Sequence, residues 1–490
     1  MTPHPSLHRI ASAWALIATV GLGACGSHGS SAPPPPPPVM HNLQVTVTGR
    51  GEVDSAPAGL ACTDACNANY DADTVVTLTA NAGAASVFIG WSGDDDCLDG
   101  QVTMSAARNC TANFVPYPNL NISAGDGFSY AFTFIGGAAF DWGSDVDEAL
   151  GNGTGAAAAS APGTTTLPAV VTAMVTSAVA HHGLAVEAVT GRVWAWGRNA
   201  EGQLGDGSLT ARGDAVVMHD TNAAEVTAAT AVATGATHSL VLLGDGRVLA
   251  AGANDAGQLG DGTTISRPLA APVPGVCAAG VPAVAIAAGR NFSLALCADG
   301  ALRAWGANAM GQLGDGSLVD RSSPVTVGGL AGITVAEIAA GGDFALALGS
   351  QGDVFAWGSN AKGQLGTDIG VVSQLSTPGR VPGFTGAVFI AAGLEHGMAL
   401  LADQAVFAWG SNAGGQIDPT PGAPAVVNFS FHVAGLSDIV EIAAGADHSM
   451  AVDASGAVWA WGSNATGQLG NGNLLPATLP VQVTGLNLLN

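Results

Sequence analysis

The sequence predicts an all-β fold, in which a small β module precedes a seven-bladed β-propeller. Glycine is abundant (70 of 490 residues) and only 10% of residues are charged, which suits short strands joined by tight turns and disfavours helical bundles. A Trp-Gly pair recurs about every 52 to 55 residues from Trp142 to Trp461, with Ala251-Gly252 standing in once. A second marker, GADHSMAV in the last repeat, recurs in step with the first.

The N-terminus, residues 1–24, is predicted to be an export signal. The segment MTPHPSLHR precedes an apolar run of about fifteen residues, which is shorter than the roughly 20 residues of a membrane-spanning helix. The run ends in Leu22-Gly23-Ala24-Cys25, which resembles the lipobox of bacterial lipoproteins. The resemblance implies cleavage before Cys25, acylation of that cysteine, and attachment to the outer membrane on its periplasmic or outer side. An ordinary secretory signal that happens to end at a cysteine is the alternative.

Residues 25–41 are predicted to be a tether. The prolines Pro33–Pro38 favour polyproline II, which extends about 3.1 Å per residue and makes a stiff spacer. A ligand for a proline-recognition domain is the alternative.

Residues 42–115 are predicted to form the small β module. LQVTVTG and TVVTLTA alternate as strands do, and FIGW, QVTM and TANF are further short strands. With GRGEVDSAPAGLAC, these segments resemble the divergent internalin-type B-repeat, which implies a spacer or adhesive unit. Asp94-Asp95-Asp96 raises the alternatives of a calcium site or a solvated turn, and the absence of a full ligand loop favours the turn.

The cysteine count fits an exported chain. Of seven cysteines, removing Cys25 to lipidation leaves an even six, so all of them can pair. Metal binding by Cys62 and Cys66 is the alternative, but their spacing is loose for zinc. The expected disulfides are Cys62–Cys66, Cys97–Cys110 and Cys277–Cys297, with the exact connectivity open.

Residues 119–490 are predicted to form the propeller, each repeat supplying four short strands such as EIAAG, HSMAV, AVWAWG and PVQVTGL. The frame W-G-x-N-x-x-G-Q-L-G-x-G, with its A-A-G-x-x-H-S partner, resembles the regulator-of-chromosome-condensation repeat, whose fold is a seven-bladed propeller. The first repeat departs most, with DWGSDVDEALGNG. Because the first repeat also lacks a strand before NISAG, Val481–Thr484 is expected to complete the N-terminal blade and close the ring.

The repeated residues are interpreted as structural, since a role needed once per blade belongs to the ring itself. Asn464 and Gln468 can hydrogen-bond buried loop backbone, and Trp461 and Leu469 can pack between blades. Histidine occupies one equivalent position in four blades and phenylalanine in the other three, which favours an aromatic plate over a metal site. These positions are His182, His238, His396 and His448, and Phe128, Phe292 and Phe344.

No catalytic set is found. Asp447, His448 and Ser449 are neighbours on one strand and point to opposite faces, so they cannot act as a triad. With every remaining cysteine paired, no thiol nucleophile is expected, and neither an enzyme nor a cofactor is predicted. The formal net charge of −24 excludes nucleic acid as a partner.

Function is expected where the repeats differ, in two sets of turn positions. The first follows AAG and should make one mouth of the propeller mostly acidic; it comprises Asp126, Arg290, Asn291, Asp343, Glu395 and Asp447. The second precedes GQLG and includes Glu201, Met310, Lys362 and Thr466. Neutral variation of exposed turns is the alternative for any single residue. Which face binds is left open.

The sequence therefore predicts a monomeric, lipid-anchored envelope protein that binds a protein through a propeller face. Relatives by resemblance include a nucleotide-exchange factor for a small GTPase and a secreted inhibitor of β-lactamases. The exchange activity does not suit an exported chain. A glycan- or cell-wall-binding propeller is the alternative, although three tyrosines in 490 residues argue against aromatic sugar pockets.

Overall fold

A computed structural model of the chain shows an almost entirely β protein. Its described residues form nine four-stranded sheets and two 3-10 helices, η1 (Asp95–Cys97) and η2 (Val146–Glu148). Within this described part, no helix is long and apolar enough to cross a membrane. The described residues are 38–48, 51–82, 86–116, 122–133, 138–153, 158–165, 167–420 and 422–489, so the predicted signal sequence, Cys25 and most of the tether lie outside them.

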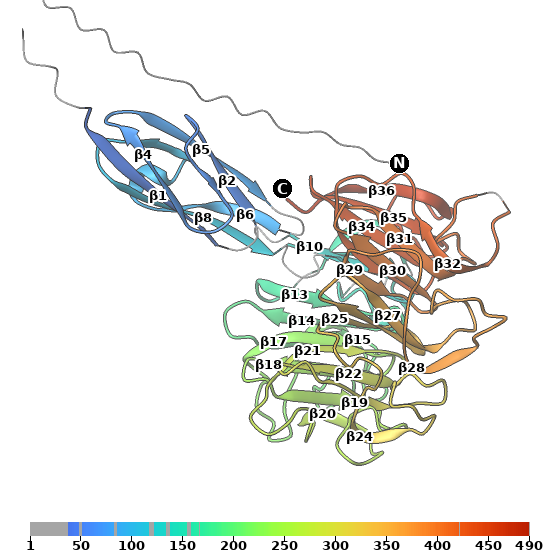
Figure 1. Ribbon diagram of the computed structural model, residues 1–490. Coiled ribbons are helices and arrows are strands. Elements are labelled where there is room, and N and C mark those ends of the chain that lie inside the picture. Colours follow the sequence, from blue (N-terminus) through green and yellow to red (C-terminus); the bar gives the residue numbers. More distant parts are fainter. Residues whose placement is uncertain are drawn as a thin grey trace, which may run out of the picture.

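The N-terminal module consists of two sheets that enclose one core (Figure 1). One sheet has the order β4-β1-β8-β6 and the other β3-β2-β5-β7. Alternating apolar residues such as Val45, Val53 and Val76 fill the space between them, as the strand pattern predicts. The strands are β1 (Met40–Thr48), β2 (Gly51–Ala56), β3 (Ala61–Cys62), β4 (Cys66–Asp71), β5 (Val75–Ala82), β6 (Ser86–Gly93), β7 (Gln101–Thr103) and β8 (Arg108–Pro116).

Two disulfides and two aspartates hold the loops of the module. Cys62 pairs with Cys66 and Cys97 with Cys110, at Cα–Cα distances of 5.7 and 5.5 Å. In the acidic triplet, Asp94 accepts a hydrogen bond from the Asn109 amide at 2.8 Å, and Asp96 accepts one from the Thr103 amide at 2.8 Å. These two carboxylates therefore fix backbone, which gives them a structural role in the turn.

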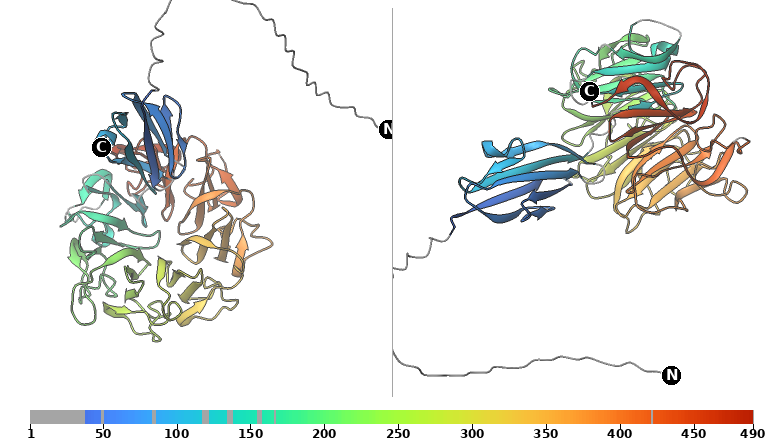
Figure 2. Two further views of the ribbon diagram at one scale, coloured as in Figure 1. Left: turned by 60° about the vertical axis from the view of Figure 1, so that its left-hand side comes forward. Right: turned by 90° about the horizontal axis from the view of Figure 1, so that it is seen from above.

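The other seven sheets are propeller blades arranged in a ring (Figures 1 and 2). The first three blades are β9 (Ile122–Ala124), β10 (Phe128–Phe132), β11 (Ala139–Ser144) and β12 (Ala158–Thr165); β13 (Val171–Val175), β14 (His182–Glu187), β15 (Val193–Gly197) and β16 (Arg212–Val217); and β17 (Ala229–Thr234), β18 (His238–Leu243), β19 (Val248–Gly252) and β20 (Arg267–Pro272).

The remaining four blades repeat this order. They are β21 (Ala283–Ala288), β22 (Phe292–Cys297), β23 (Leu302–Gly306) and β24 (Arg321–Thr326); β25 (Val335–Ala340), β26 (Phe344–Gly349), β27 (Val354–Ser359) and β28 (Gln374–Arg380); β29 (Ala387–Ala392), β30 (His396–Leu401), β31 (Val406–Ser411) and β32 (Val426–His432); and β33 (Ile439–Ala444), β34 (His448–Asp453), β35 (Ala457–Gly462) and β36 (Ala477–Asn487).

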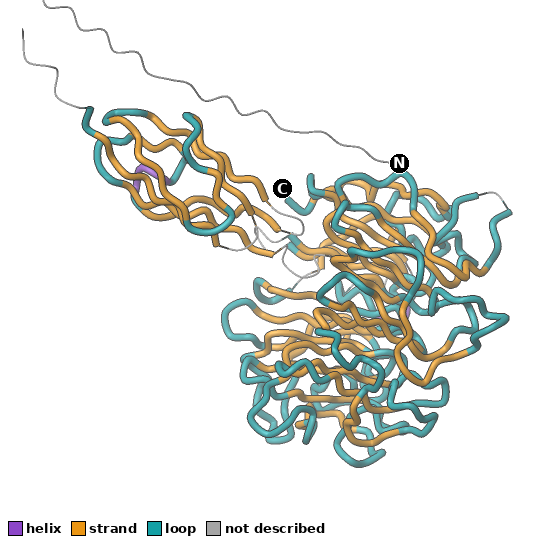
Figure 3. The backbone as a smooth tube through the Cα atoms, in the orientation of Figure 1, coloured by secondary structure: helices purple, strands orange, loops and turns teal. Residues whose placement is uncertain are grey.

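Burial explains why the strands of one blade differ in sequence. The second strand is packed on both faces, so β34 and its counterparts are buried along nearly their whole length and read as continuous apolar runs. The fourth strand lies at the rim of the ring, and in β36 only Val483 and Leu486 are buried. Strands and loops alternate regularly around the ring in Figure 3, as the repeat period predicts.

The prediction for ring closure is wrong. The segment Val481–Thr484 belongs to β36, which pairs with β35 of its own repeat through Trp459–Gln482 and Ala460–Val481. The first blade obtains its fourth strand from β12, whose small and polar residues AASAPGTT carry no strong strand signal. Each blade is thus one continuous segment, and the first and last blades meet side by side in the ring without exchanging a strand (Figure 2).

Contacts between these two blades close the ring instead. The Trp142 indole donates to the Gln468 carbonyl at 2.8 Å, and Trp142 and Leu469 share one hydrophobic cluster. The Gly472 amide donates to the Ser160 carbonyl at 2.8 Å. Gly470 has φ +63°, and a Cβ there would lie 2.8 Å from the Trp142 indole nitrogen, so only glycine suits this turn. The closing contacts are therefore of the kind found between the other blades.

Candidate functional site

Both sets of variable turn residues lie on one face of the propeller. In every blade the first strand ends at the AAG turn, and the third strand, antiparallel to the second, ends at the same edge with its Trp-Gly pair. In the last blade the Ser463 amide donates to the Asp447 carbonyl at 2.9 Å, and the Thr466 hydroxyl donates to the Gly127 carbonyl of the next blade at 2.7 Å. The sequence left open whether the two sets lie on different faces of the propeller. In the structure they share one face, which we call the AAG face.

A belt of backbone hydrogen bonds fixes the turns of this face. The Ala236 amide donates to the Arg290 carbonyl, the Arg290 amide to the Gly342 carbonyl, and the Gly342 amide to the Leu394 carbonyl, at 3.0 to 3.2 Å. The Leu394 amide bonds to Gly445 in the same way, and Ala446 bonds to Gly125 across the closure. Side chains at the mouth thus project from a backbone that is hydrogen-bonded from blade to blade. Because these turns are already ordered, a partner can bind with little loss of backbone conformational entropy.

The mouth is acidic but partly neutralised, and its charges are not distributed evenly. Asp126 lies 3.1 Å from His181, whose other ring nitrogen lies 3.7 Å from Asp147. Asp343 lies 3.3 Å from Arg290. Burial, and then the nearby Asp126 carboxylate, raise the pKa of Asp447 above its usual value. The sequence did not single out His181 or Asp147, although both stand where the first two repeats depart from the frame.

The residues before GQLG surround this mouth. Glu201 forms an ion pair with Arg198 at 2.9 Å, and Met310 is 42% exposed. Lys362 is exposed, and its amide donates to Gln364 at 2.7 Å. Asn291 and Glu395 occupy the turn positions next to Phe292 and His396, where their backbone carbonyls accept the Ala307 and Ser411 amides at 2.9 and 2.8 Å. The predicted partner-binding residues of both sets thus lie on the AAG face.

The repeated polar residues hold the loops, as the sequence analysis expects. The Asn464 side chain donates to the carbonyls of Asn473 and Leu475 at 3.0 and 2.9 Å and accepts from the Leu469 amide at 3.0 Å. The Gln468 side chain accepts from the Thr466 amide at 3.0 Å, while its carbonyl receives the indole of the next blade. Both side chains are buried, so their absence would leave backbone groups unpaired.

The first blade reaches the same result with different residues. Ala149 stands where other blades have glutamine, and the Tyr130 hydroxyl bonds to its carbonyl while accepting the Trp196 indole at 2.8 Å. Burial raises the pKa of Tyr130 well above its usual value. Asp145 stands where the other blades have asparagine and accepts from the Leu150 amide at 3.0 Å. The departure noted in the sequence is therefore a structural substitution.

The four repeated histidines do not gather around a metal. Each Nε2 contacts the serine that follows the aromatic position in the next blade: His182–Ser239 at 2.9 Å, His238–Ser293 at 3.0 Å, His396–Ser449 at 3.1 Å and His448–Ser129 at 2.8 Å. Among the described residues no group of three or more His, Cys, Asp or Glu side chains could hold a metal ion. The same contacts bring His448 and Ser449 into different interfaces.

The phenylalanine positions complete this pattern. In the other three interfaces, the next blade has no serine at the position that would meet the aromatic ring. Gly183 follows Phe128 in this way, Ala345 follows Phe292, and Gly397 follows Phe344. None of these three residues can hydrogen-bond through a side chain. At all seven interfaces, a histidine of one blade is therefore opposed by a serine of the next blade, and a phenylalanine by a glycine or an alanine. This rule was not predicted from the sequence, although the residue that follows the aromatic position in the next repeat carries the signal.

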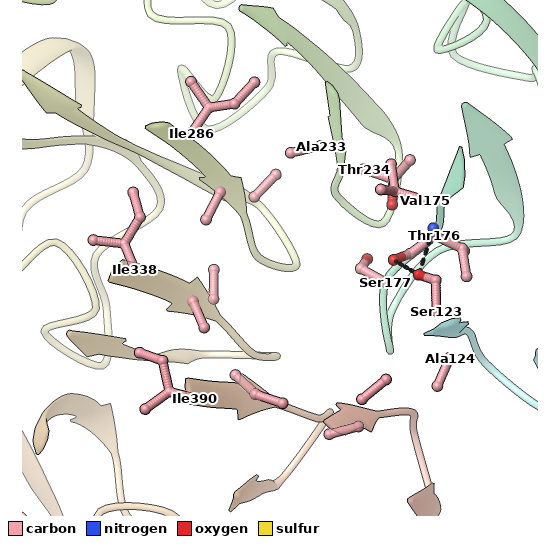
Figure 4. Close-up of a pocket in the computed structure, with 18 of the residues that line it drawn as sticks. Ser123, Ala124, Val175, Thr176, Ser177, Ala233, Thr234, Ile286, Ile338 and Ile390 are labelled. Carbon is pink, nitrogen blue, oxygen red and sulfur yellow. Dashed lines mark hydrogen bonds between the residues drawn. The ribbon is translucent and has the colours of Figure 1, made fainter. Parts of the chain in front are cut away.

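The central channel is lined by the first strands and divides into two halves (Figure 4). Hydroxyl groups from Ser123, Thr176, Ser177 and Thr234 lie on one side, where the Ser123 hydroxyl donates to the Thr176 carbonyl at 2.9 Å. Ile286, Ile338 and Ile390 lie on the other side. The channel has a volume of about 190 Å³.

Glu337 is the acidic side chain of this lining. Its carboxylate accepts from the Ile390 amide of the next blade at 3.2 Å. Burial raises its pKa to about 8, and the hydrogen bond only partly opposes this effect. Glu441, at the equivalent position of the last blade, accepts from the Ile122 amide at 3.2 Å in the same manner. These two glutamates tie first strands together.

The third disulfide lies away from this face. Cys277 pairs with Cys297 at a Cα–Cα distance of 5.8 Å and ties the segment before β21 to the end of β22. Because β21 and β22 are antiparallel, the start of β21 and the end of β22 lie at the same edge of the sheet, so the disulfide is a local structural link. The six cysteines of the described chain are thus paired as the sequence analysis expects.

Comparison with known proteins identifies the family. The RCC1-like domain matches residues 90–427, the regulator of chromosome condensation (RCC1) repeat matches 439–468 and 455–488, and the divergent InlB B-repeat domain matches 41–118. The chain is similar to the ultraviolet-B receptor UVR8 of Arabidopsis thaliana, with 30% identity over 59% of this chain and 65% of the receptor. It is also similar to human HERC6, named a probable E3 ubiquitin-protein ligase, with 36% identity over 49% of this chain but only 24% of that protein.

Solved structures agree with this assignment. Human WBSCR16 superposes with a TM-score of 0.61 and 26% identity, covering 71% of this chain and 94% of that one. Yeast RCC1 (Prp20), solved bound to Kap60, gives a TM-score of 0.64 and 22% identity over 72% of this chain and 85% of its own, which shows a shared fold. The seven-bladed ring, the repeated frame and the matching domain together show that the chain belongs to the RCC1-like domain family, with a divergent InlB B-repeat domain at its N-terminus.

Proposed function

We propose that this chain is a non-catalytic, lipid-anchored envelope protein that binds a partner protein through the AAG face. The observation that carries the proposal is the contrast on that face between a fixed backbone and varied side chains. The belt of hydrogen bonds ties the turns together, while the residue directly before the aromatic position varies from blade to blade: Gly127, His181, Thr237, Asn291, Asp343, Glu395 and Asp447.

The fold is consistent with binding. RCC1-like propellers are protein-binding scaffolds, and yeast RCC1 has been solved in complex with Kap60. For this chain, acid side chains at the mouth and an overall charge of −24 favour a partner with a basic surface. Among the described residues, the exposed large apolar side chains include one aromatic, Phe429, on the outer strand β32, so repeated sugar-stacking pockets find no support.

The proposed anchor is supported by the sequence alone. The run ending at Cys25 motivates export and acylation, and the tether with the N-terminal module would separate the propeller from the membrane. Labelling with a radioactive fatty acid tests this part, with Cys25→Ser as the control. Label lost on substitution is expected; equal label in both proteins would refute the anchor and leave the binding face untouched.

Affinity capture tests the binding face. The bait is soluble 42–490, compared with a mouth variant (Asp343→Asn, Glu395→Gln, Asp447→Asn). A control variant removes equal charge from the opposite face (Asp299→Asn, Asp403→Asn, Asp438→Asn). We expect one envelope or culture protein to be retained by the bait and the control and lost by the mouth variant. Equal retention by all three would contradict the AAG face, and no specific protein with any bait would contradict protein binding and direct the search to glycans.

A further inference from the structure

The seven interfaces between blades fall into two chemical classes. Four of them, between blades 2 and 3, 3 and 4, 6 and 7, and 7 and 1, contain a histidine–serine hydrogen bond. The other three, between blades 1 and 2, 4 and 5, and 5 and 6, contain Phe128, Phe292 and Phe344. We call these the histidine seams and the phenylalanine seams.

The hydrogen bonds fix the protonation state of each seam histidine. The Ser129 hydroxyl donates to the Gln468 carbonyl at 3.0 Å, so its oxygen must accept from His448 Nε2. Ser239, Ser293 and Ser449 donate in the same way to the carbonyls of residues 203, 258 and 416. The proton of each ring therefore lies on Nε2, and each ring serves as a donor in its neutral form.

The second ring nitrogen, Nδ1, has no hydrogen-bond acceptor beside it that could stabilise its protonated form. Nδ1 of His182, His238, His396 and His448 is buried without a hydrogen-bond partner. The rings of His238, His396 and His448 are packed against the glycine of the AAG turn: a Cβ on Gly445 would lie 2.3 Å from Cε1 of His448. A protonated ring would thus carry a buried N–H with nothing to bond to.

The charged groups near these rings do not offset the cost of burying a protonated ring. His182 faces His238, His181 and Arg198, and His396 faces His448, all of which oppose a second positive charge. Asp255 acts favourably on His238 and Asp126 on His448, but burial outweighs both. As a result, the pKa of His182 and His396 falls to about 3, and that of His238 and His448 to about 4.

We propose that the four histidine seams are acid-sensitive joints, which open in mildly acidic solution while the phenylalanine seams stay closed. Opening a seam exposes its histidine to water, where the ring can take up a proton. Since the residue before each histidine, such as Asp447 or Glu395, belongs to the mouth, an open seam also disrupts the AAG face. This device does not depend on the identity of any partner.

The direction follows from the two pKa values. The pKa of a solvated histidine, about 6.5, lies above that of the buried ring, so the stability supplied by the neutral ring is fully present above pH 6.5. It is lost as the pH falls toward 4. Over this interval the equilibrium constant for opening one histidine seam rises about tenfold per pH unit. The phenylalanine seams lack this dependence, but the seam between blades 5 and 6 also carries Glu337, whose raised pKa makes that seam more stable as the pH falls.

Hydrogen–deuterium exchange can follow both classes in the same molecule, because the belt supplies one amide to each of five seams. The amides of Ala236, Leu394 and Ala446 cross histidine seams, and those of Arg290 and Gly342 cross phenylalanine seams. Between pH 6.5 and 4.5, after correction for intrinsic exchange, we expect protection of the first group to fall about tenfold per pH unit relative to Arg290, whereas Gly342, which shares its seam with Glu337, should keep or gain protection. A parallel response of both groups would overturn the proposal.

Exchanging the two chemistries gives a matched test. His448→Phe with Ser129→Ala copies the Phe292–Ala345 pair and should make Ala446 insensitive to acid. Phe292→His with Ala345→Ser installs a histidine seam and should make Arg290 sensitive. Urea unfolding at pH 7.5 verifies that each variant is folded. Unchanged pH responses in the folded variants would contradict the proposal; if neither folds, the comparison within the unaltered chain still decides.

Discussion

The blade interfaces and the AAG face use the same repeats in opposite ways. At the interfaces the residues recur from blade to blade, are buried and have defined hydrogen-bond partners, as Trp461, Asn464 and Gln468 do. On the AAG face the backbone recurs but the side chains differ, and many are exposed. The difference teaches that repetition in this chain identifies the framework and that function should be sought in the positions that vary.

The largest effect is expected from an interface tryptophan. Trp461→Ala removes a fully buried ring and its 2.8 Å hydrogen bond to the Gln416 carbonyl, so it should lower the free energy of unfolding by about 3–5 kcal/mol. Urea unfolding at pH 7.5 measures this loss. Trp459→Ala on the same strand is the control, because that ring is only partly buried and should cost less than half as much. Equal losses would contradict the claim that the interface tryptophan stabilises the ring more than the partly buried one.

A smaller loss is expected from a frame asparagine. Asn464→Ala leaves the Leu469 amide and the carbonyls of Asn473 and Leu475 without their partner, and should lower the free energy of unfolding by about 2–3 kcal/mol. Asn473→Ala, at an exposed position of the same loop, should stay within about 0.5–1 kcal/mol. Thermal or urea unfolding of the two variants measures both losses. Similar losses in the two variants would contradict the framework role of Asn464.

The channel glutamate should respond to pH. The folded-state pKa of Glu337 is raised to about 8, so ionisation of the unfolded state lowers stability progressively from about pH 4.5 to pH 8. Glu337→Gln removes this penalty and should stabilise the ring by at least about 1 kcal/mol at pH 8, with a smaller or reversed effect at pH 5. Urea unfolding at both pH values tests the sign. A variant equally stable at the two pH values relative to the parent would contradict it.

The smallest effect is expected at the mouth. Burial and the neighbouring Asp126 raise the pKa of Asp447, so its charge is mildly unfavourable in the folded state at neutral pH. Asp447→Asn should leave the free energy of unfolding unchanged or raise it by a few tenths of a kcal/mol, while reducing capture of the partner. A clear loss of stability would show that this mouth residue is part of the framework.

The sequence predicted most of the ring because its two markers repeat in step. The strand order within a blade, the packing of Trp461 and Leu469 and the loop bonds of Asn464 all follow from that frame and are present in the structure. The ring closure was predicted wrongly because β12 is built from small and polar residues, which give weak strand signals.

The site was predicted only in part. The variable positions were found, but their common face required the antiparallel course of the strands to be followed through each blade. The histidine–serine rule was missed because each repeat was read by itself, whereas His448 is explained by Ser129 at the other end of the propeller. The cluster of Asp126, His181 and Asp147 was missed because it spans the two repeats that depart from the frame.

The most direct test of this account is the unfolding free energy of a variant in which the mouth charges are removed together. Asp126→Asn, Asp343→Asn, Glu395→Gln and Asp447→Asn alter four turns and break two exposed ion pairs, which are each worth no more than about 1 kcal/mol. We predict that urea unfolding of this variant at pH 7.5 stays within about 1–2 kcal/mol of the unaltered chain, and below the cost of Asn464→Ala alone. A mouth variant that loses more stability than the single frame substitution would contradict the separation of framework and function.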